Sequence, residues 1–116
     1  MDHKGHQYGE NSKEYNDALI SADHWTGRIM DKLKELNLYD ETLIYVTADH
    51  GFDEGMKSHN DAPYVFLATN DTLVMRRGER ADITPTILKR FGLDLSRISP
   101  PLDGHPLIEP YQPPRW

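Results

Sequence analysis

Five side chains of the types that bind divalent cations stand in three short segments of the sequence. Asp2 and His6 are separated by three residues, and Asp49 is adjacent to His50. His59 follows nine positions after His50, in a segment that contains several Gly and Asp residues. Carboxylate oxygens and imidazole nitrogens are ligands that Zn²⁺ or Mn²⁺ accepts. Because the chain has no cysteine, any metal must be bound by Asp, Glu and His.

The Asp49–His50 pair gives the strongest of these three signals. It directly follows the apolar and β-branched residues 42–48, and active sites of open α/β sheets gather where strands end. The alternative is a capping Asp beside a surface His. Asp2 and His6 alone would be equally consistent with two solvated side chains, and His59 alone indicates nothing. The three segments together favour a metal site.

One long amphipathic helix is predicted after a polar N-terminal segment. Residues 1–11 contain two glycines and read as a loop. Ser12 is a suitable N-cap, and apolar residues then recur at helical spacing to about Asn37. Three of these apolar residues are expected in the core: Tyr15, Leu19 and Ile29.

Strands are predicted in the middle of the chain. Residues 42–48 are nearly all apolar or β-branched, which indicates a strand buried on both faces. Residues 63–68 predict a second strand, and residues 73–75 a short third. Two good strands and two helices make a thin sheet for an α/β domain. The pattern therefore predicts part of an α/β layer.

A second helix and an irregular tail complete the predicted elements. The helix is expected over residues 82–91, because a proline suits its first turn and Gly92 suits the position after its end. Arg76 and Arg77 could contact an anion, but a solvated turn is favoured. Residues 109–116 read as a Pro-rich tail.

The bulk composition excludes some classes of function. The formal net charge of −6 argues against a nucleic-acid polymer as partner. No apolar stretch approaches the ~20 residues that span a bilayer. Met1 is followed at once by polar residues, so no signal peptide is expected, and the compartment stays open.

With these residues in place, the sequence resembles the alkaline phosphatase superfamily, and most closely its type I phosphodiesterase/nucleotide pyrophosphatase branch. It is also similar to cofactor-independent phosphoglycerate mutases and to sulfatases. Five segments carry the resemblance: Asp2–Gly9, Thr47–Gly51, His59–Pro63, and the closing segments 82–93 and 103–107.

The resemblance implies a metal-dependent hydrolase of small phosphate or sulfate esters. Asp2, His6 and His59 would bind one of two divalent cations, and Asp49 and His50 would help to bind the second. Zinc is expected, with manganese as the alternative, and this chain would bind one of the two ions.

The resemblance also implies an alkaline-phosphatase-like, mostly parallel sheet flanked by helices. Residues 1–108 would form the C-terminal portion of the catalytic domain, lacking the N-terminal half that carries the nucleophile. A chain of this kind would be weakly active alone and could self-associate through an open sheet. The alternatives are a non-catalytic metal-binding fragment, or an interaction protein whose metal ligands are relics.

Overall fold

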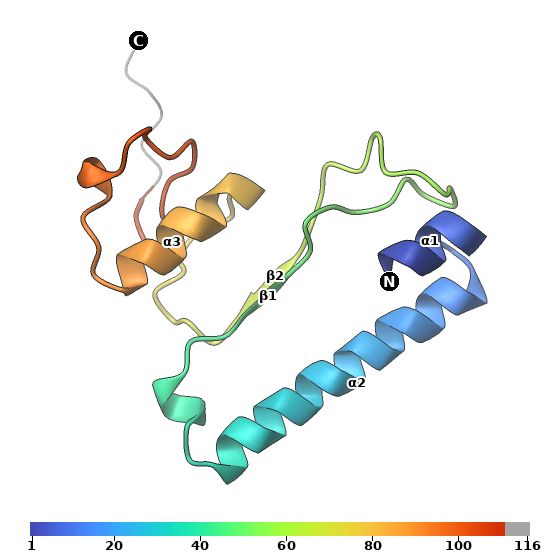
Figure 1. Cartoon of the computed structure of the whole chain (residues 1–116), viewed down its shortest axis with the longest axis horizontal. Helices are drawn as coiled ribbons and strands as arrows, with labels where there is room; N and C mark the ends of the chain where they lie inside the picture. The colour runs from blue at the N-terminus through green and yellow to red at the C-terminus, as the bar shows by residue number, and fades with distance from the viewer. Residues whose placement is uncertain (111–116) are drawn as a thin grey trace. The chain divides into compact units, whose positions relative to one another are not determined.

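The structure is a computed structural model that describes residues 1–110. The chain forms two compact units, Met1–Asn70 and Asp71–Trp116. Each unit is considered by itself. Of the predicted Pro-rich tail, residues 111–116 lie outside the described part of the chain. Figure 1 shows the elements of each unit in sequence order.

The first unit begins with a helix, α1 (Asp2–Tyr8), so the predicted N-terminal loop is wrong. The two glycines that suggested a loop have other roles. Gly9 ends the helix with a φ of 98°, a conformation that glycine adopts without a steric penalty. Gly5 lies inside the helix and is buried, because the ring of Phe52 packs against its Cα.

The long predicted helix is confirmed as α2 (Lys13–Glu35). The hydroxyl oxygen of Ser12 accepts a hydrogen bond of 3.1 Å from the backbone N–H of Tyr15, which is the expected N-cap. The helix ends close to the predicted boundary, where Asn37 takes a left-handed conformation with a φ of 57°. A short 3₁₀ turn, η1 (Tyr39–Glu41), leads to the strands.

The expected core position is wrong for two of the three α2 side chains, while Tyr15 is half-buried and contacts the ring of Phe52. No residue of this helix is buried, and Leu19 and Ile29 are 43% and 64% exposed. The apolar spacing forms a helix, but its inner face, which includes Tyr15, Met30 and Leu33, is only half-buried. Helical periodicity reports which side chains share a face and does not supply the partner.

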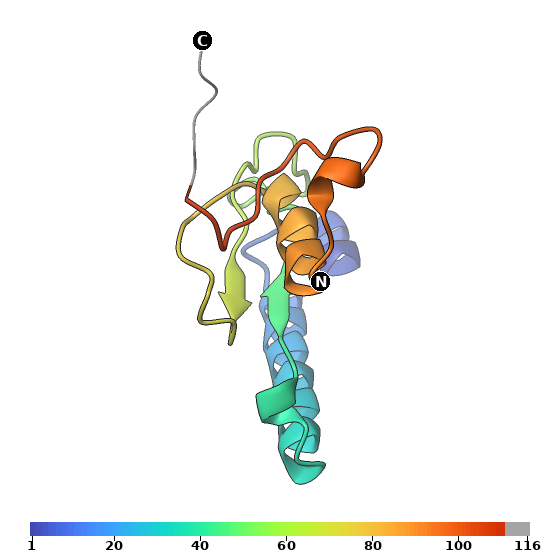
Figure 2. The ribbon, with the colours of Figure 1, turned by 90° about the vertical axis from the view of Figure 1, so that its left-hand side faces the viewer.

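The sheet of the first unit has two antiparallel strands, β1 (Tyr45–Thr47) and β2 (Leu67–Thr69), with Val46 opposite Ala68. Figure 2 shows them running in opposite directions. The side-chain amide of Asn70 extends the pairing, because it accepts from the N–H of Ile44 and donates to the carbonyl of Thr42.

Both strands are shorter than predicted, and burial on both faces of the first is wrong. Tyr45 and Val46 are half-buried and Thr47 is exposed. The mixture of helices and strands agrees with an α/β class at a coarse level. The strand pair among residues 1–110 is antiparallel, so the mostly parallel sheet is not shown.

The second unit contains one main helix, α3 (Ile83–Arg90), flanked by 3₁₀ turns η2 (Arg80–Asp82) and η3 (Leu95–Arg97). The predicted helix is confirmed, and Gly92 follows it with a φ of 76°. The predicted third strand at residues 73–75 is wrong, because this segment forms no strand.

The interior of the second unit is organised by polar groups. Arg76 and Asp82 form an ion pair of 2.9 Å with side chains only 14% and 9% exposed, so the solvated turn expected at Arg76 is wrong. The hydroxyl of Thr86, fully buried, donates to the Asp82 carbonyl and accepts from the N–H of Leu107. These bonds connect the segment around Leu107 to α3.

None of the helices in the described residues is long and apolar enough to cross a membrane.

Candidate metal centre

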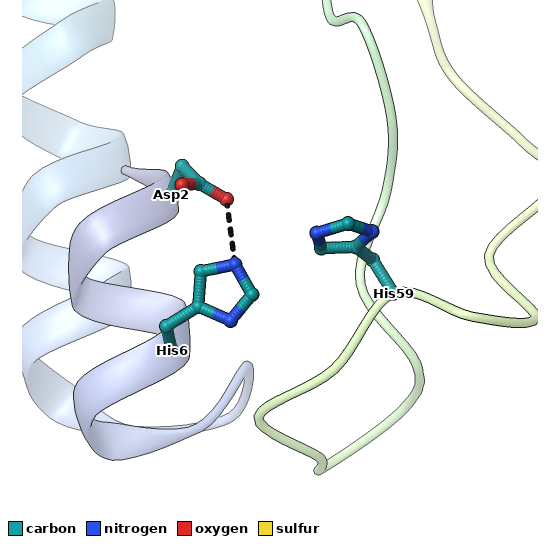
Figure 3. Close-up of side chains that lie close together, drawn as sticks. All are labelled: Asp2, His6 and His59. Carbon is teal, nitrogen blue, oxygen red and sulfur yellow. Dashed lines mark ion pairs between the residues drawn. The ribbon is translucent and has the colours of Figure 1, made fainter.

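Two parts of the first unit bring the predicted ligands together. Helix α1 presents Asp2 and His6 one turn apart on the same face, because residues at i and i+4 of a helix are neighbours. The long loop between β1 and β2 presents His59. Figure 3 shows the three side chains pointing toward one another. One ligand atom from each residue lies within 4.8 Å of the others.

The carboxylate of Asp2 lies close to the imidazoles of His6 and His50. Its Oδ1 lies 3.3 Å from Nε2 of His6 and 3.6 Å from Nε2 of His50. Oδ2 of Asp49 lies 3.8 Å from the same nitrogen of His50. The His50 side chain is 23% exposed and that of Asp49 is 91% exposed. The structure therefore places His50 within the cluster and Asp49 at its solvent side.

Two of the histidines are oriented by backbone carbonyls. Nδ1 of His6 lies 2.8 Å from the carbonyl oxygen of Lys57, and Nδ1 of His50 lies 2.9 Å from that of Gly51. A carbonyl only accepts, so each Nδ1 must carry the hydrogen. Nε2 of each ring is then the nitrogen that could bind a cation. Metal-binding histidines commonly have this arrangement, with the second nitrogen donating to a carbonyl.

An aromatic side chain holds the histidine rings in place. The ring of Phe52 makes edge contacts with those of His6, His50 and His59, at centroid distances of 5.2, 5.9 and 5.6 Å. The rings of His50 and His59 are stacked at 3.9 Å. The sequence analysis missed Phe52. Its position two residues after His50 was the available signal, since an aromatic residue in a polar loop needs a packing partner.

Asp53 organises the loop that carries His59, and it too was missed. Its carboxylate accepts hydrogen bonds from Ser58, Asn60 and Asp61. The Ser58 hydroxyl and the Asp61 N–H are the main reasons that the pKa of Asp53 is lowered. The ionised form is therefore the one that the loop binds.

The donor set fits a divalent cation. In a tetrahedral site with metal–ligand bonds of ~2.0 Å, neighbouring ligand atoms are about 3.3 Å apart. The Oδ1 of Asp2 and the Nε2 of His6 lie at this separation, 3.3 Å. One carboxylate with two or three imidazoles is also a ligand set that zinc or manganese accepts.

Comparison with known proteins agrees with the motif analysis. The family model described as type I phosphodiesterase / nucleotide pyrophosphatase matches residues 1–99. All five predicted ligands lie within that range. No solved structure matches the chain significantly.

Similar proteins come from two groups. A 2,3-bisphosphoglycerate-independent phosphoglycerate mutase of Clostridium kluyveri is 33% identical over 88 residues, which are 66% of this chain and 16% of that protein. Ectonucleotide pyrophosphatase/phosphodiesterase family member 7 of Mus musculus is 27% identical over 113 residues, 96% of this chain and 26% of that protein. Family member 1 of Homo sapiens is 43% identical over 54 residues, 47% of this chain and 6% of that protein.

The chain thus spans between about a sixth and a quarter of the first two of these relatives. The family match covers far more than half of the chain itself. The chain belongs to the type I phosphodiesterase / nucleotide pyrophosphatase family, within the alkaline phosphatase superfamily.

Proposed function

We propose that this chain provides the metal-binding part of a hydrolase that acts on small phosphate esters. The observation that carries the proposal is the cluster of Asp2, His6 and His59, with ligand atoms within 4.8 Å of one another. Membership of the family supports the same reaction class.

The five ligands divide into two groups in this proposal. Asp2, His6 and His59 bind one divalent cation, and Asp49 with His50 contributes to a second site. Such cations stabilise the developing charge on phosphoryl oxygens and lower the pKa of a bound nucleophile. Zinc is the first candidate and manganese the second. The residues' own task is to present neutral Nε2 atoms and carboxylate oxygens in a fixed arrangement.

Phosphate esters rank above sulfate esters as substrates. The relatives are named as a nucleotide pyrophosphatase/phosphodiesterase and as a phosphoglycerate mutase, and both names refer to phosphate compounds. The nucleophile is assigned to a residue outside the five-residue cluster. Residues 1–108 form a portion of a catalytic domain in this proposal, and β1 belongs to a larger, mostly parallel sheet.

Metal binding by the purified chain tests the proposal directly. Titration calorimetry with Zn²⁺ and with Mn²⁺ is expected to show binding that His59→Ala abolishes. His24→Ala is the matched control, because His24 is an exposed histidine of α2 whose ring contacts that of Trp25 and not those of the cluster. Equal affinity in the unaltered chain and in His59→Ala would show that the cluster is not the metal site.

Turnover is measured beside binding, with bis(p-nitrophenyl) phosphate and p-nitrophenyl sulfate. Little activity above background is expected from this chain alone, because we assign the nucleophile to the N-terminal part of the catalytic domain, which this chain does not span. Robust phosphodiester hydrolysis lost in Asp49→Ala would show that the chain carries its own nucleophile. Robust hydrolysis of the sulfate ester alone would overturn the substrate class.

A further inference from the structure

One residue, Asp53, makes many of the hydrogen bonds within the loop that presents His59. The backbone N–H of Asp53 donates to the carbonyl of Ser58 at 3.0 Å, and its carbonyl accepts from the N–H of Met56 at 2.9 Å. Its carboxylate then accepts three more hydrogen bonds. Both the backbone and the side chain of this residue therefore fix the course of the loop.

The three carboxylate bonds enclose His59 in the sequence. Oδ2 accepts from the hydroxyl of Ser58 at 2.7 Å and from the N–H of Asn60 at 3.0 Å, and Oδ1 accepts from the N–H of Asp61 at 2.8 Å. The residues on both sides of His59 are thus held by the same carboxylate. Because the backbone is fixed before and after His59, the position of its Cα is fixed as well.

We propose that Asp53 is a positioning residue that holds His59 in place for metal binding, an inference that rests on the proposed function. Asp53 itself is not a ligand in this proposal. It acts through the loop, while His50 and Phe52 contact the His59 ring by stacking and by an edge contact. Partners of this kind commonly change metal affinity by 10–100-fold when they are removed.

An amide cannot replace the Asp53 carboxylate. In Asp53→Asn, an NH₂ group at the Oδ2 position would meet the N–H of Asn60, and at the Oδ1 position it would meet the N–H of Asp61. Either orientation sets one donor against another, so at least one hydrogen bond is lost. The substitution keeps the size of the side chain and removes its negative charge and part of its acceptor pattern.

The experiment compares Asp53→Asn with Glu54→Gln, the same chemical change at the next residue. Glu54 is exposed and makes none of the bonds to the His59 loop. Zn²⁺ affinity is measured by competition with a chelator, and the visible absorption of bound Co²⁺ is recorded at saturation. Asp53→Asn is expected to bind Zn²⁺ 10–100-fold more weakly. Its Co²⁺ spectrum should shift toward that of His59→Ala, while Glu54→Gln matches the unaltered chain.

The outcomes separate this inference from the proposed function. If the unaltered chain binds no metal, the proposed function fails and the inference fails with it. If the unaltered chain binds metal, and Asp53→Asn has the same affinity and the same Co²⁺ spectrum, only the positioning role is overturned. Circular dichroism of the metal-free proteins monitors folding. Ser58→Ala removes one of the three bonds and should weaken binding by a smaller factor, so the proposal stays testable if Asp53→Asn does not fold.

Discussion

At the scale of single residues, Asp82 shows how one buried carboxylate can hold a segment. It accepts hydrogen bonds from the N–H groups of His105 and Glu79 and from the guanidinium of Arg76. Arg76 in turn donates to the carbonyls of His105 and Pro106. Removing one partner of a buried ion pair leaves the other charge uncompensated, which is more costly than the pair itself is favourable.

Asp82→Ala is therefore expected to destabilise the second unit by about 3–5 kcal/mol. Asp103→Ala is the control, because Asp103 is exposed and nearby in sequence, and it should change stability by less than about 0.5 kcal/mol. Urea unfolding followed by circular dichroism measures both. A loss below about 1 kcal/mol in Asp82→Ala would contradict the role given to the ion pair.

The stability of the same unit should depend on pH. Burial raises the pKa of Asp82, but the N–H groups of His105 and Glu79 and the charge of Arg76 outweigh it, so the pKa is lowered overall. A carboxyl with a lowered folded pKa stabilises the fold above its unfolded pKa of about 3.9, and this contribution is lost as the pH falls through the folded pKa. The urea midpoint of unfolding should decrease as the pH is lowered from 6 to 2. This decrease should be less steep in Asp82→Asn.

At the scale of elements, the ligands depend on how α1 packs against the β1–β2 loop. Gly5 is the contact point, because a Cβ there would lie within 2.8 Å of three carbons of the Phe52 ring. That ring also contacts Tyr15 at the start of α2, at 5.5 Å between centroids. Phe52 therefore has little freedom to move without displacing the histidines around it.

Gly5→Ala is expected to weaken Zn²⁺ binding, although alanine favours helices over glycine by ~1 kcal/mol. Overpacking commonly costs about 1–3 kcal/mol, and here it would fall on the ring that contacts His6 and His59. Gly27→Ala is the matched control, since a Cβ at Gly27 would meet no other atom of residues 1–110 within 4 Å beyond its own helix backbone. The control should raise thermal stability and leave Zn²⁺ affinity unchanged. Unchanged affinity in Gly5→Ala would show that α1 does not need this close approach.

At the scale of the whole molecule, exposed apolar side chains are abundant. On one side of α2, Trp25 and Ile29 lie one turn apart and are 63% and 64% exposed. Monomeric proteins seldom leave large contiguous apolar patches in water. Burial of apolar area gains ~25 cal/mol per Å², so a few hundred Å² would favour association by several kcal/mol before entropy costs.

We therefore expect this chain to self-associate as its concentration rises. Sedimentation velocity over a dilution series measures this. Ile29→Glu should shift the equilibrium toward monomer, because it places a charge on the apolar face. Asn16→Glu adds the same charge at an exposed polar position of the same helix and serves as control. A monomer at every concentration would contradict the expectation.

The local features of this protein could be predicted from its sequence. Capping chemistry and apolar periodicity predicted the N-cap at Ser12 and the long helix α2 after it. They also predicted α3, which Gly92 follows, and the predicted helix ends lie within a few residues of the observed ones. The residue types and order of the five candidate ligands were also readable, because metal-binding chemistry restricts which side chains serve.

The packing and the hydrogen bonds of those residues depend on long-range contacts, which the tertiary structure shows. Long-range contacts made α1 a helix in spite of Gly5 and placed the Lys57 carbonyl against His6, 51 positions earlier. They also buried Arg76 against Asp82 and left Leu19 and Ile29 of α2 exposed. Local propensity and spacing are set by neighbouring residues, whereas burial, ring packing and the second hydrogen bond of a histidine depend on segments distant in the sequence.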